Sequence, residues 1–253
     1  MTEMVKSSLG FRVLHANKLI PEVVKVTEPD ETTAKTDSTS QDNLHGIKSR
    51  DAGWIDVGDM SLTIKDTGGS LYADLKALQR ARTKELWELA YAPVGCGRAI
   101  QGLAFVSKCK HGHADDGGAQ TIELTITPTS YFADLSTGAA GLTTPFLSVA
   151  DDDTHALTLS PSASGSAYDY ECTAFSSGTA NINSETVTIT PTAAVGTIYV
   201  NGVAVTSGQA SAAIPISQTQ GDVTMIGVAV CEVNKASKTY LIRVKMGNAA
   251  YSA

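Results

Sequence analysis

Hydrophobic and polar positions alternate along most of this chain, which is the pattern of a β-strand with one buried face. In the first half the alternation predicts strands at Phe11 to Leu14, Val23 to Thr27, Trp54 to Lys65, Ala99 to Lys110 and Gln120 to Pro128. The segment KELWELAY fits both the helical and the strand period. We favour a strand, because Gly95 and Gly97 would then close a hairpin into Ala99.

One helix is predicted in the first half. It starts after Gly68, Gly69 and a capping Ser70, with Leu71, Leu75 and Leu78 at helical spacing. Basic residues near its carboxyl end suit the helix dipole, so the helix is expected to end near Arg82. An antiparallel sheet with one packed helix makes this half an α+β domain within a mainly β chain.

The second half shows no helical pattern. Its short strands have the spacing of a β-sandwich and are expected at Ala156 to Leu159, Tyr168 to Phe175, Glu185 to Thr190, Thr197 to Val200, Val203 to Thr206, Ala212 to Ile216, Val223 to Val233 and Thr239 to Met246. Asn201 and Gly202 predict a tight hairpin, because both central residues of that turn need positive φ. We expect this module to fold without a partner.

A polar segment from Glu28 to Asp51 interrupts the alternation. Its only bulky aliphatic residues are Leu44 and Ile47, so it cannot bury enough apolar surface to order itself. We expect contacts outside the monomer to order it.

The charge density changes along the chain. Residues 1–140 carry 15 Lys+Arg and 18 Asp+Glu, whereas the remaining 113 residues carry 4 and 8. Small, turn-favouring residues fill Ser136 to Thr144, which predicts a boundary near Gly141 between a domain of residues 1–140 and one of residues 141–253.

Composition narrows the possible partners. The chain of 253 residues is 42% hydrophobic and 18% charged with a net charge of −7, which argues against free nucleic acid as a ligand. No apolar run approaches the ~20 residues that span a bilayer, and the amino-terminal residues lack a signal-type pattern, so we expect no membrane partner and cytoplasmic synthesis. Cys96, Cys109, Cys172 and Cys231 are widely spaced, which predicts free thiols that are buried or half-buried.

Candidate catalytic or metal chemistry is sparse. His111 and His113 with Asp115 and Asp116 are better explained by a polar turn between two strands. The run 151–153 of aspartates lacks the spacing of a calcium loop and is expected to be a solvated turn, and no G-x-S-x-G motif occurs. We therefore predict no catalytic residues, no metal site and no cofactor, and a protein that is not an enzyme.

Several motifs together resemble the major tail tube proteins of long-tailed, lambda-like bacteriophages (siphoviruses). They are the block VTEPDETTAKTDSTSQDNLHGIKSRDAGWIDVGDMSLTIKD, the helix SLYADLKALQRA, and the strands AIQGLAFVSKCK and TIELTITPTS. In that family a Thr-rich acidic segment precedes a "D-x-G-D/E-h-S-h" strand, which is matched here by Asp56 to Leu62. The resemblance covers about the first 140 residues, and the second half is similar to bacterial immunoglobulin-like or cadherin-like modules that are appended to such proteins.

The resemblance implies a viral structural protein of the virion tail. Six subunits would join their antiparallel sheets into a β-barrel lumen, and stacked hexameric rings would form a conduit for DNA ejection. The DNA would pass without specific binding along a wall lined by Asp and Glu that repels phosphate. The immunoglobulin-like domain would lie on the exterior, and the expected partners are further copies of the chain and the tape measure, tail-tip and tail terminator proteins.

The polar segment would then contact the neighbouring subunit or ring. The residues expected to do so are Glu28, Asp30, Thr32, Thr33, Lys35, Asp37, Asp42, Leu44, Ile47, Arg50 and Trp54. Two alternatives remain open: a tube subunit of a contractile or type VI-like secretion system, and a bacterial surface adhesin or glycan-binding module.

Overall fold

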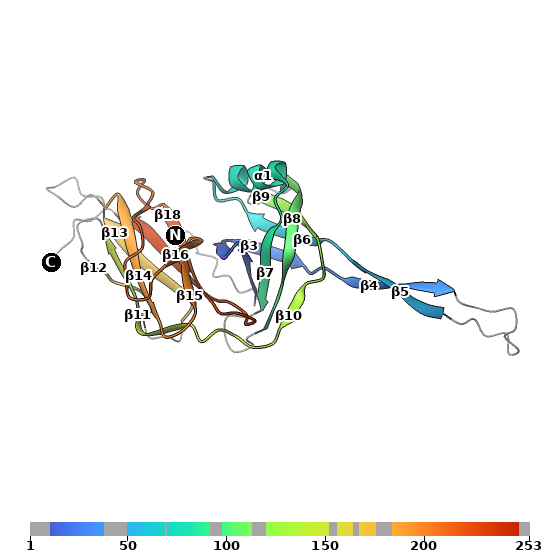
Figure 1. The fold of residues 1–253 in the computed structure, drawn as a ribbon. Coiled ribbons are helices and arrows are strands. Elements are labelled where there is room, and N and C mark those ends of the chain that lie inside the picture. Colours follow the sequence, from blue (N-terminus) through green and yellow to red (C-terminus); the bar gives the residue numbers. More distant parts are fainter. Residues whose placement is uncertain are drawn as a thin grey trace, which may run out of the picture. The chain divides into compact units, whose positions relative to one another are not determined.

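The structure, a computed structural model, describes residues 11–37, 50–68, 70–91, 98–112, 120–151, 156–163, 167–175 and 184–247. It is mainly β with one helix and several antiparallel sheets, which confirms the predicted class. The chain divides into two compact units (Figure 1). The sandwich unit holds Met1–Pro21, Leu86–Gln101 and Asp134–Ala253, and the helix unit holds Glu22–Glu85 and Gly102–Ala133. The domain boundary near Gly141 stays a prediction.

Two sheets form the core of the sandwich unit. One has the order β12-β11-β14-β17 and the other β13-β19-β18-β15-β16. Their strands are β11 (Leu142–Asp151), β12 (Ala156–Leu157), β13 (Asp169–Phe175), β14 (Thr186–Ala193), β15 (Thr197–Val200), β16 (Val203–Val205), β17 (Ile214–Pro215), β18 (Val223–Cys231) and β19 (Lys238–Gly247). Val187 and Ile189 of the first sheet share a buried cluster with Ile226 and Ile242 of the second, so alternate side chains of both sheets build the core.

The predicted hairpin at Asn201 and Gly202 is confirmed. It joins β15 to β16, and the two turn residues have φ values of 48° and 84°. The Asn201 side chain also accepts a 2.9 Å hydrogen bond from the backbone N–H of Gly227, which ties the turn to β18.

Strands from the first half of the sequence cover the outer face of the five-stranded sheet. They are β1 (Phe11–His15), β2 (Lys18–Ile20) and β7 (Glu85–Tyr91), in the order β2-β1-β7, followed by the start of β8 (Arg98–Gly112). Leu14 and Ala90 form a buried cluster with Ala229 and Ala236. The expectation that the sandwich needs no partner is therefore corrected: it shares a second apolar core with strands far away in sequence.

A buried carboxylate reinforces this contact. Glu88 of β7 is 2% exposed and accepts hydrogen bonds from the backbone N–H and the hydroxyl of Ser237, both at 2.6 Å. Arg12 of β1 contributes a 3.1 Å ion pair to Asp169 of β13, to which Arg243 also lies close at 3.5 Å. Removing Ser237 would leave the buried carboxylate of Glu88 without two of its hydrogen bonds, which makes this contact specific.

The helix unit is a sheet with one helix. Its sheet has the order β8-β9-β6-β3, built from β3 (Val23–Thr27), β6 (Met60–Lys65), β9 (Thr121–Pro128) and the later part of β8, with α1 (Leu71–Ala81) beside β8 and β9 (Figure 1). Met60, Leu62 and Ile64 face Ile126, Leu124 and Ile122 across the β6–β9 pair, and all six are buried. The short β10 (Ala133–Leu135) pairs with β8.

Several local predictions need correction. The strand predicted over Trp54 to Lys65 is two strands, because β5 (Arg50–Val57) ends before Gly58 and β6 begins at Met60. The predicted linker around Gly141 runs into a strand, β11, and Asp151 at its end is 4% exposed rather than solvated, with the Ser184 hydroxyl donating to it at 3.4 Å. Cys109 and Cys172 are free and buried as predicted, Cys231 is half-buried, and Cys96 lies outside the described residues.

The close approach of β2 to β18 gives a first prediction. A Cβ atom on Gly227 would lie 2.7 Å from the Cβ of Leu19, nearer than two carbon atoms can pack. We expect Gly227→Ala to lower the free energy of unfolding by about 1–3 kcal/mol, because β2 must shift away from the sheet. Urea unfolding measures this, and Val203→Ala, at a 63% exposed residue, is the control that should change little. Equal stabilities for both variants would show that β2 does not dock on β18.

Glu88 gives a second prediction. Burial raises the pKa of its carboxyl group, and the hydrogen bonds from Ser237 and Gln101 offset part of this rise, while the Cys231 thiol also lies close. A folded pKa above the unfolded one makes a contribution to stability that is complete in acid and is lost as the pH rises through the folded pKa. Glu88→Gln stays neutral, so the variant should gain stability relative to the unmodified chain as the pH rises from the unfolded pKa of a glutamate, about 4.3, through the folded pKa. Parallel unfolding curves across that range would contradict the assignment.

Candidate assembly interface

The polar segment forms a two-stranded antiparallel ribbon of its own. β4 (Glu31–Asp37) pairs with β5, from Glu31 opposite Val57 to Asp37 opposite Arg50. The expectation that this segment has no order within the monomer is wrong for these strands, because β4 and β5 pair with each other. Threonine-rich strands have high β propensity, which favours this pairing. The ribbon extends away from β3 and β6 in the helix unit (Figure 1).

A β-bulge in the ribbon places Trp54 in solvent. Thr33 faces Ile55 and Lys35 faces Ala52, so Gly53 and Trp54 together oppose the single residue between Thr33 and Lys35. Bulges of this kind redirect a side chain and twist the strand. Trp54 is 88% exposed and Ile55 is 62% exposed. Both of these large apolar side chains are therefore exposed on a polar ribbon.

The predicted interface residues are distributed over this ribbon and its base. Glu28, Asp30, Thr32, Thr33, Lys35 and Trp54 are exposed, and the backbones of Asp37 and Arg50 pair at the far end of the described ribbon. Asp42, Leu44 and Ile47 lie outside the described residues. The backbone carbonyl of Asp30 accepts a 2.7 Å hydrogen bond from the N–H of Gly58, which fixes the base of the ribbon. Their role in assembly stays a prediction.

The exposure of Ile55 was not predicted from the sequence. The sequence prediction placed Ile55 in one long strand from Trp54 to Lys65, whereas a bulge and the end of β5 interrupt that strand. The glycine before Trp54 was the available signal, since a glycine inside a strand pattern often marks a bulge.

The two edges of the sheet in the helix unit differ. Helix α1 covers part of β8, where Lys76 Nζ donates to the carbonyl of Cys109 at 2.8 Å and Gln79 Nε2 donates to the carbonyl of Ser107 at 2.9 Å. At the other edge, β3 pairs only with β6 among the described strands. Val24 lies at a register shift in β3 and is 49% exposed. An edge strand with free backbone groups can accept another strand.

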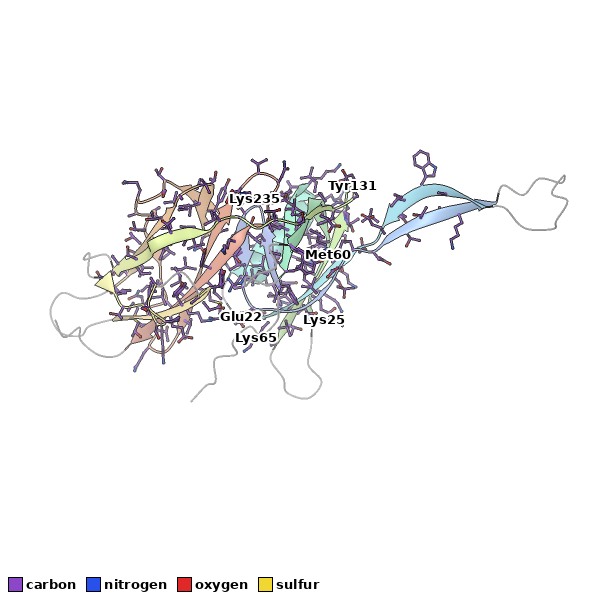
Figure 2. The ribbon with its side chains drawn as sticks, turned by 90° about the horizontal axis from the view of Figure 1, so that it is seen from below. Glu22, Lys25, Met60, Lys65, Tyr131 and Lys235 are labelled. Carbon is purple, nitrogen blue, oxygen red and sulfur yellow. The ribbon has the colours of Figure 1, made fainter. Side chains whose placement is uncertain are left out.

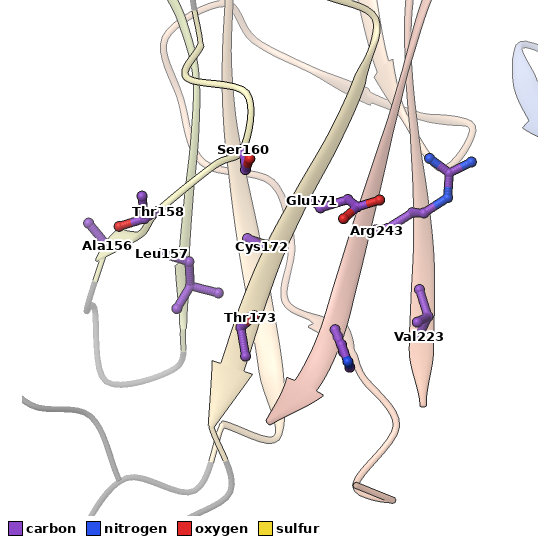
Figure 3. Close-up of a pocket in the computed structure, with 10 residues that line it drawn as sticks. Ala156, Leu157, Thr158, Ser160, Glu171, Cys172, Thr173, Val223 and Arg243 are labelled. Atoms are coloured by element: carbon purple, nitrogen blue, oxygen red, sulfur yellow. The ribbon is translucent and has the colours of Figure 1, made fainter. Parts of the chain in front are cut away.

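The sandwich unit contains a cavity of about 330 Å³ (Figure 3). Its lining includes Leu157, Ser160, Glu171, Cys172, Arg243 and Lys245. Burial raises the pKa of Cys172 to about 12, so this thiol is not an activated nucleophile. None of the described lining residues is aromatic, so the cavity offers no stacking surface for a sugar ring.

Metal-ligating residues do not gather in the described part of the chain. No group of three or more His, Cys, Asp or Glu residues that could hold a metal ion occurs there. Of the histidine-rich turn, only His111 is described; its ring stacks on Tyr72 and its Nδ1 lies 3.5 Å from an oxygen of Asp66. Within the described residues, no helix is long and apolar enough to span a membrane.

Comparisons with known proteins give distant structural matches. No family model matches the chain, and no curated protein does. A protein in the C6-symmetric tail of an empty gene transfer agent particle is 10% identical, with a TM-score of 0.40, over 51% of this chain and 97% of that one. The tube-terminating cap of the anti-feeding prophage is 9% identical, with a TM-score of 0.43, over 54% of this chain and 95% of that one.

A protein of the sheath–tube complex of an extracellular contractile injection system, in its extended state, gives 12% identity and a TM-score of 0.39, over 54% of this chain and 95% of that one. These low identities and scores do not establish a family for the chain.

Proposed function

We propose that this chain is a structural subunit of a bacteriophage-type tail tube, which assembles with copies of itself into stacked hexameric rings that conduct DNA. The proposal rests on the resemblance of the first 140 residues to tail tube proteins of long-tailed phages. The observation that carries it is the β4–β5 ribbon with its exposed Trp54.

The ribbon needs a partner for energetic reasons. An isolated two-stranded hairpin is at best marginally stable in water. Burying a tryptophan and a neighbouring isoleucine against another subunit would contribute roughly 1.5–3 kcal/mol for each large side chain. Threonine and charged side chains around them would form a polar rim, which is the usual composition of a protein interface.

The open edge of β3 supports a second contact. Addition of a strand from a neighbouring copy would satisfy the free backbone groups of β3 and continue the sheet from subunit to subunit. Contacts between different surfaces of identical chains form a ring when the rotation closes. A ribbon contact between rings and an edge contact within a ring would together give a tube.

The sandwich would then be part of the folded core of each subunit and not an appended domain that folds separately. Its outer face is covered by β1, β2 and β7, so the exterior domain and the tube-forming half would fold together. Truncation after residue 140 would expose Leu14, Ala90 and the buried carboxylate of Glu88.

Electron microscopy of the purified chain over a concentration series tests the function. We expect rings or tubes at high protein concentration. Trp54→Ser should leave the unfolding free energy within about 0.5 kcal/mol, because the side chain is exposed in the monomer, but should prevent rings from stacking. Val24→Lys, which places a charge at the β3 edge, should prevent ring formation.

A matched control separates specific from general effects. Val233→Lys adds the same charge at a residue that is 88% exposed in the sandwich unit and should leave assembly intact. A chain that stays monomeric at every concentration, including after addition of a tail-tip complex, would contradict the proposal. If Trp54→Ser forms stacked rings as well as the unmodified chain does, the ribbon contact through Trp54 is not part of the interface.

A further inference from the structure

The face of the helix-unit sheet opposite the buried face of β6 and β9 is polar, and its rows follow from the strand register. Residues paired across neighbouring strands lie on the same face. Lys25 pairs with Thr63, Thr63 with Glu123, and Glu123 with Lys110. The neighbouring rows are Thr27, Ser61, Thr125 and Lys108 on one side and Lys65, Thr121 and Gly112 on the other.

These three rows define a lysine face on a chain whose net charge is −7. It carries Lys25, Lys65, Lys108 and Lys110, and within these rows of described residues Glu123 is the only carboxylate. Lys25, Lys108 and Lys110 are exposed, and Figure 2 shows Lys25 and Lys65 on the same side of the unit, with Glu22 at its margin. The acidic composition of the whole chain is therefore reversed locally.

The single acid on this face does not cancel its potential. Lys110 forms a 2.7 Å ion pair with Glu123, while Lys25, Lys65 and Lys108 have no ion pair with a described residue. The hydrogen bond from Lys110 lowers the pKa of Glu123 most, and the charges of Lys110 and Lys108 lower it further. Asp59 lies beyond the rows, where it accepts a 2.8 Å hydrogen bond from the Thr127 hydroxyl.

We propose that the lysine face is a phosphate-contacting surface for nucleic acid. Ammonium groups neutralise phosphates, and the hydroxyls of Thr27, Ser61, Thr63, Thr121 and Thr125 between them can donate to phosphate oxygens. Residues two apart on a strand are about 7 Å apart and strands are about 4.8 Å apart, so the donors form a regular grid. Such a grid reads no base edges and holds the backbone without sequence preference.

The chemistry of this face favours nucleic acid over a protein partner. Protein interfaces depend on buried aromatic or aliphatic anchors, and the three rows contain none. The inference rests on the proposed tube function only for the source of the nucleic acid, the DNA in the conduit. It replaces the expectation of an acid-lined wall with a wall that contacts phosphate weakly through spaced lysines.

Fluorescence anisotropy of a labelled DNA duplex of random sequence tests the proposal with the full-length chain. We expect weak binding that falls with salt between about 20 and about 200 mM, with a log–log slope of about −3, since each neutralised phosphate contributes about −0.9. The double variant K108Q/K110Q should reduce the size of the slope by about 2, and the quadruple variant that adds K25Q and K65Q should abolish binding.

The control variant K18Q/K84Q removes the same charge as the double variant from exposed lysines outside both the face and the ribbon, and it should bind as the unmodified chain does. Equal loss of binding in the control, or no binding of the unmodified chain at low salt, would overturn the proposal. Polyglutamate serves as a second probe. If its binding depends on the four lysines while DNA binding does not, the face belongs to an acidic protein partner and the nucleic-acid assignment is wrong.

Electron microscopy of the same preparations keeps this test separate from the proposed function. Rings without lysine-dependent DNA binding would contradict the phosphate-contacting surface and support the proposed tube. Lysine-dependent DNA binding by a chain that never forms rings would support the phosphate-contacting surface and contradict the proposed tube.

Discussion

Backbone groups at the edges of sheets need partners, and the ways in which this chain provides them determine its organisation. Part of β8 is covered by α1, whose Lys76 and Gln79 donate to strand carbonyls at 2.8 and 2.9 Å. No described strand does the same for β3. Natural sheets usually protect their edges against association. The open edge of β3, in the same unit as a ribbon with an exposed tryptophan, is therefore an argument for the proposed self-association.

The packing of the sandwich shows why compact units and sequence halves can differ. Leu14 and Ala90 bury their side chains with Ala229 and Ala236, and Leu19 lies against a glycine in β18 because no side chain fits there. These contacts join segments more than 100 residues apart. A change in charge density along the chain reports on surfaces exposed to solvent and contains no information about such contacts. The two sandwich sheets and the strands β1, β2 and β7 consequently belong to one folded unit.

The sequence predicted features whose cause is local. Asn201 and Gly202 need positive φ, and that requirement alone determined the hairpin. Strict alternation located β6 and β9, and leucines at helical spacing located α1. Features that depend on distant partners were not predictable in this way. The ribbon partner of Thr33 lies beyond a polar stretch with no hydrophobic register, and Asp151 is buried by Ser184, 33 residues later in the chain. The bulge at Gly53 and Trp54 also depends on the pairing with β4, although the glycine was a local signal for it.

Net charge is a property of the composition, whereas a binding surface is a property of register. Lys25, Lys65, Lys108 and Lys110 lie on three strands of the sequence with acids between them, so counting charges along the chain averages them away. Pairing β3 with β6, β6 with β9 and β9 with β8 brings the four lysines to one face, and the intervening positions on that face are mainly Thr and Ser. A polyanion that moves along such a face would meet attractive charges about 5–15 Å apart rather than a continuous basic patch. Widely spaced contacts can be exchanged one at a time, so weak attraction and sliding are compatible.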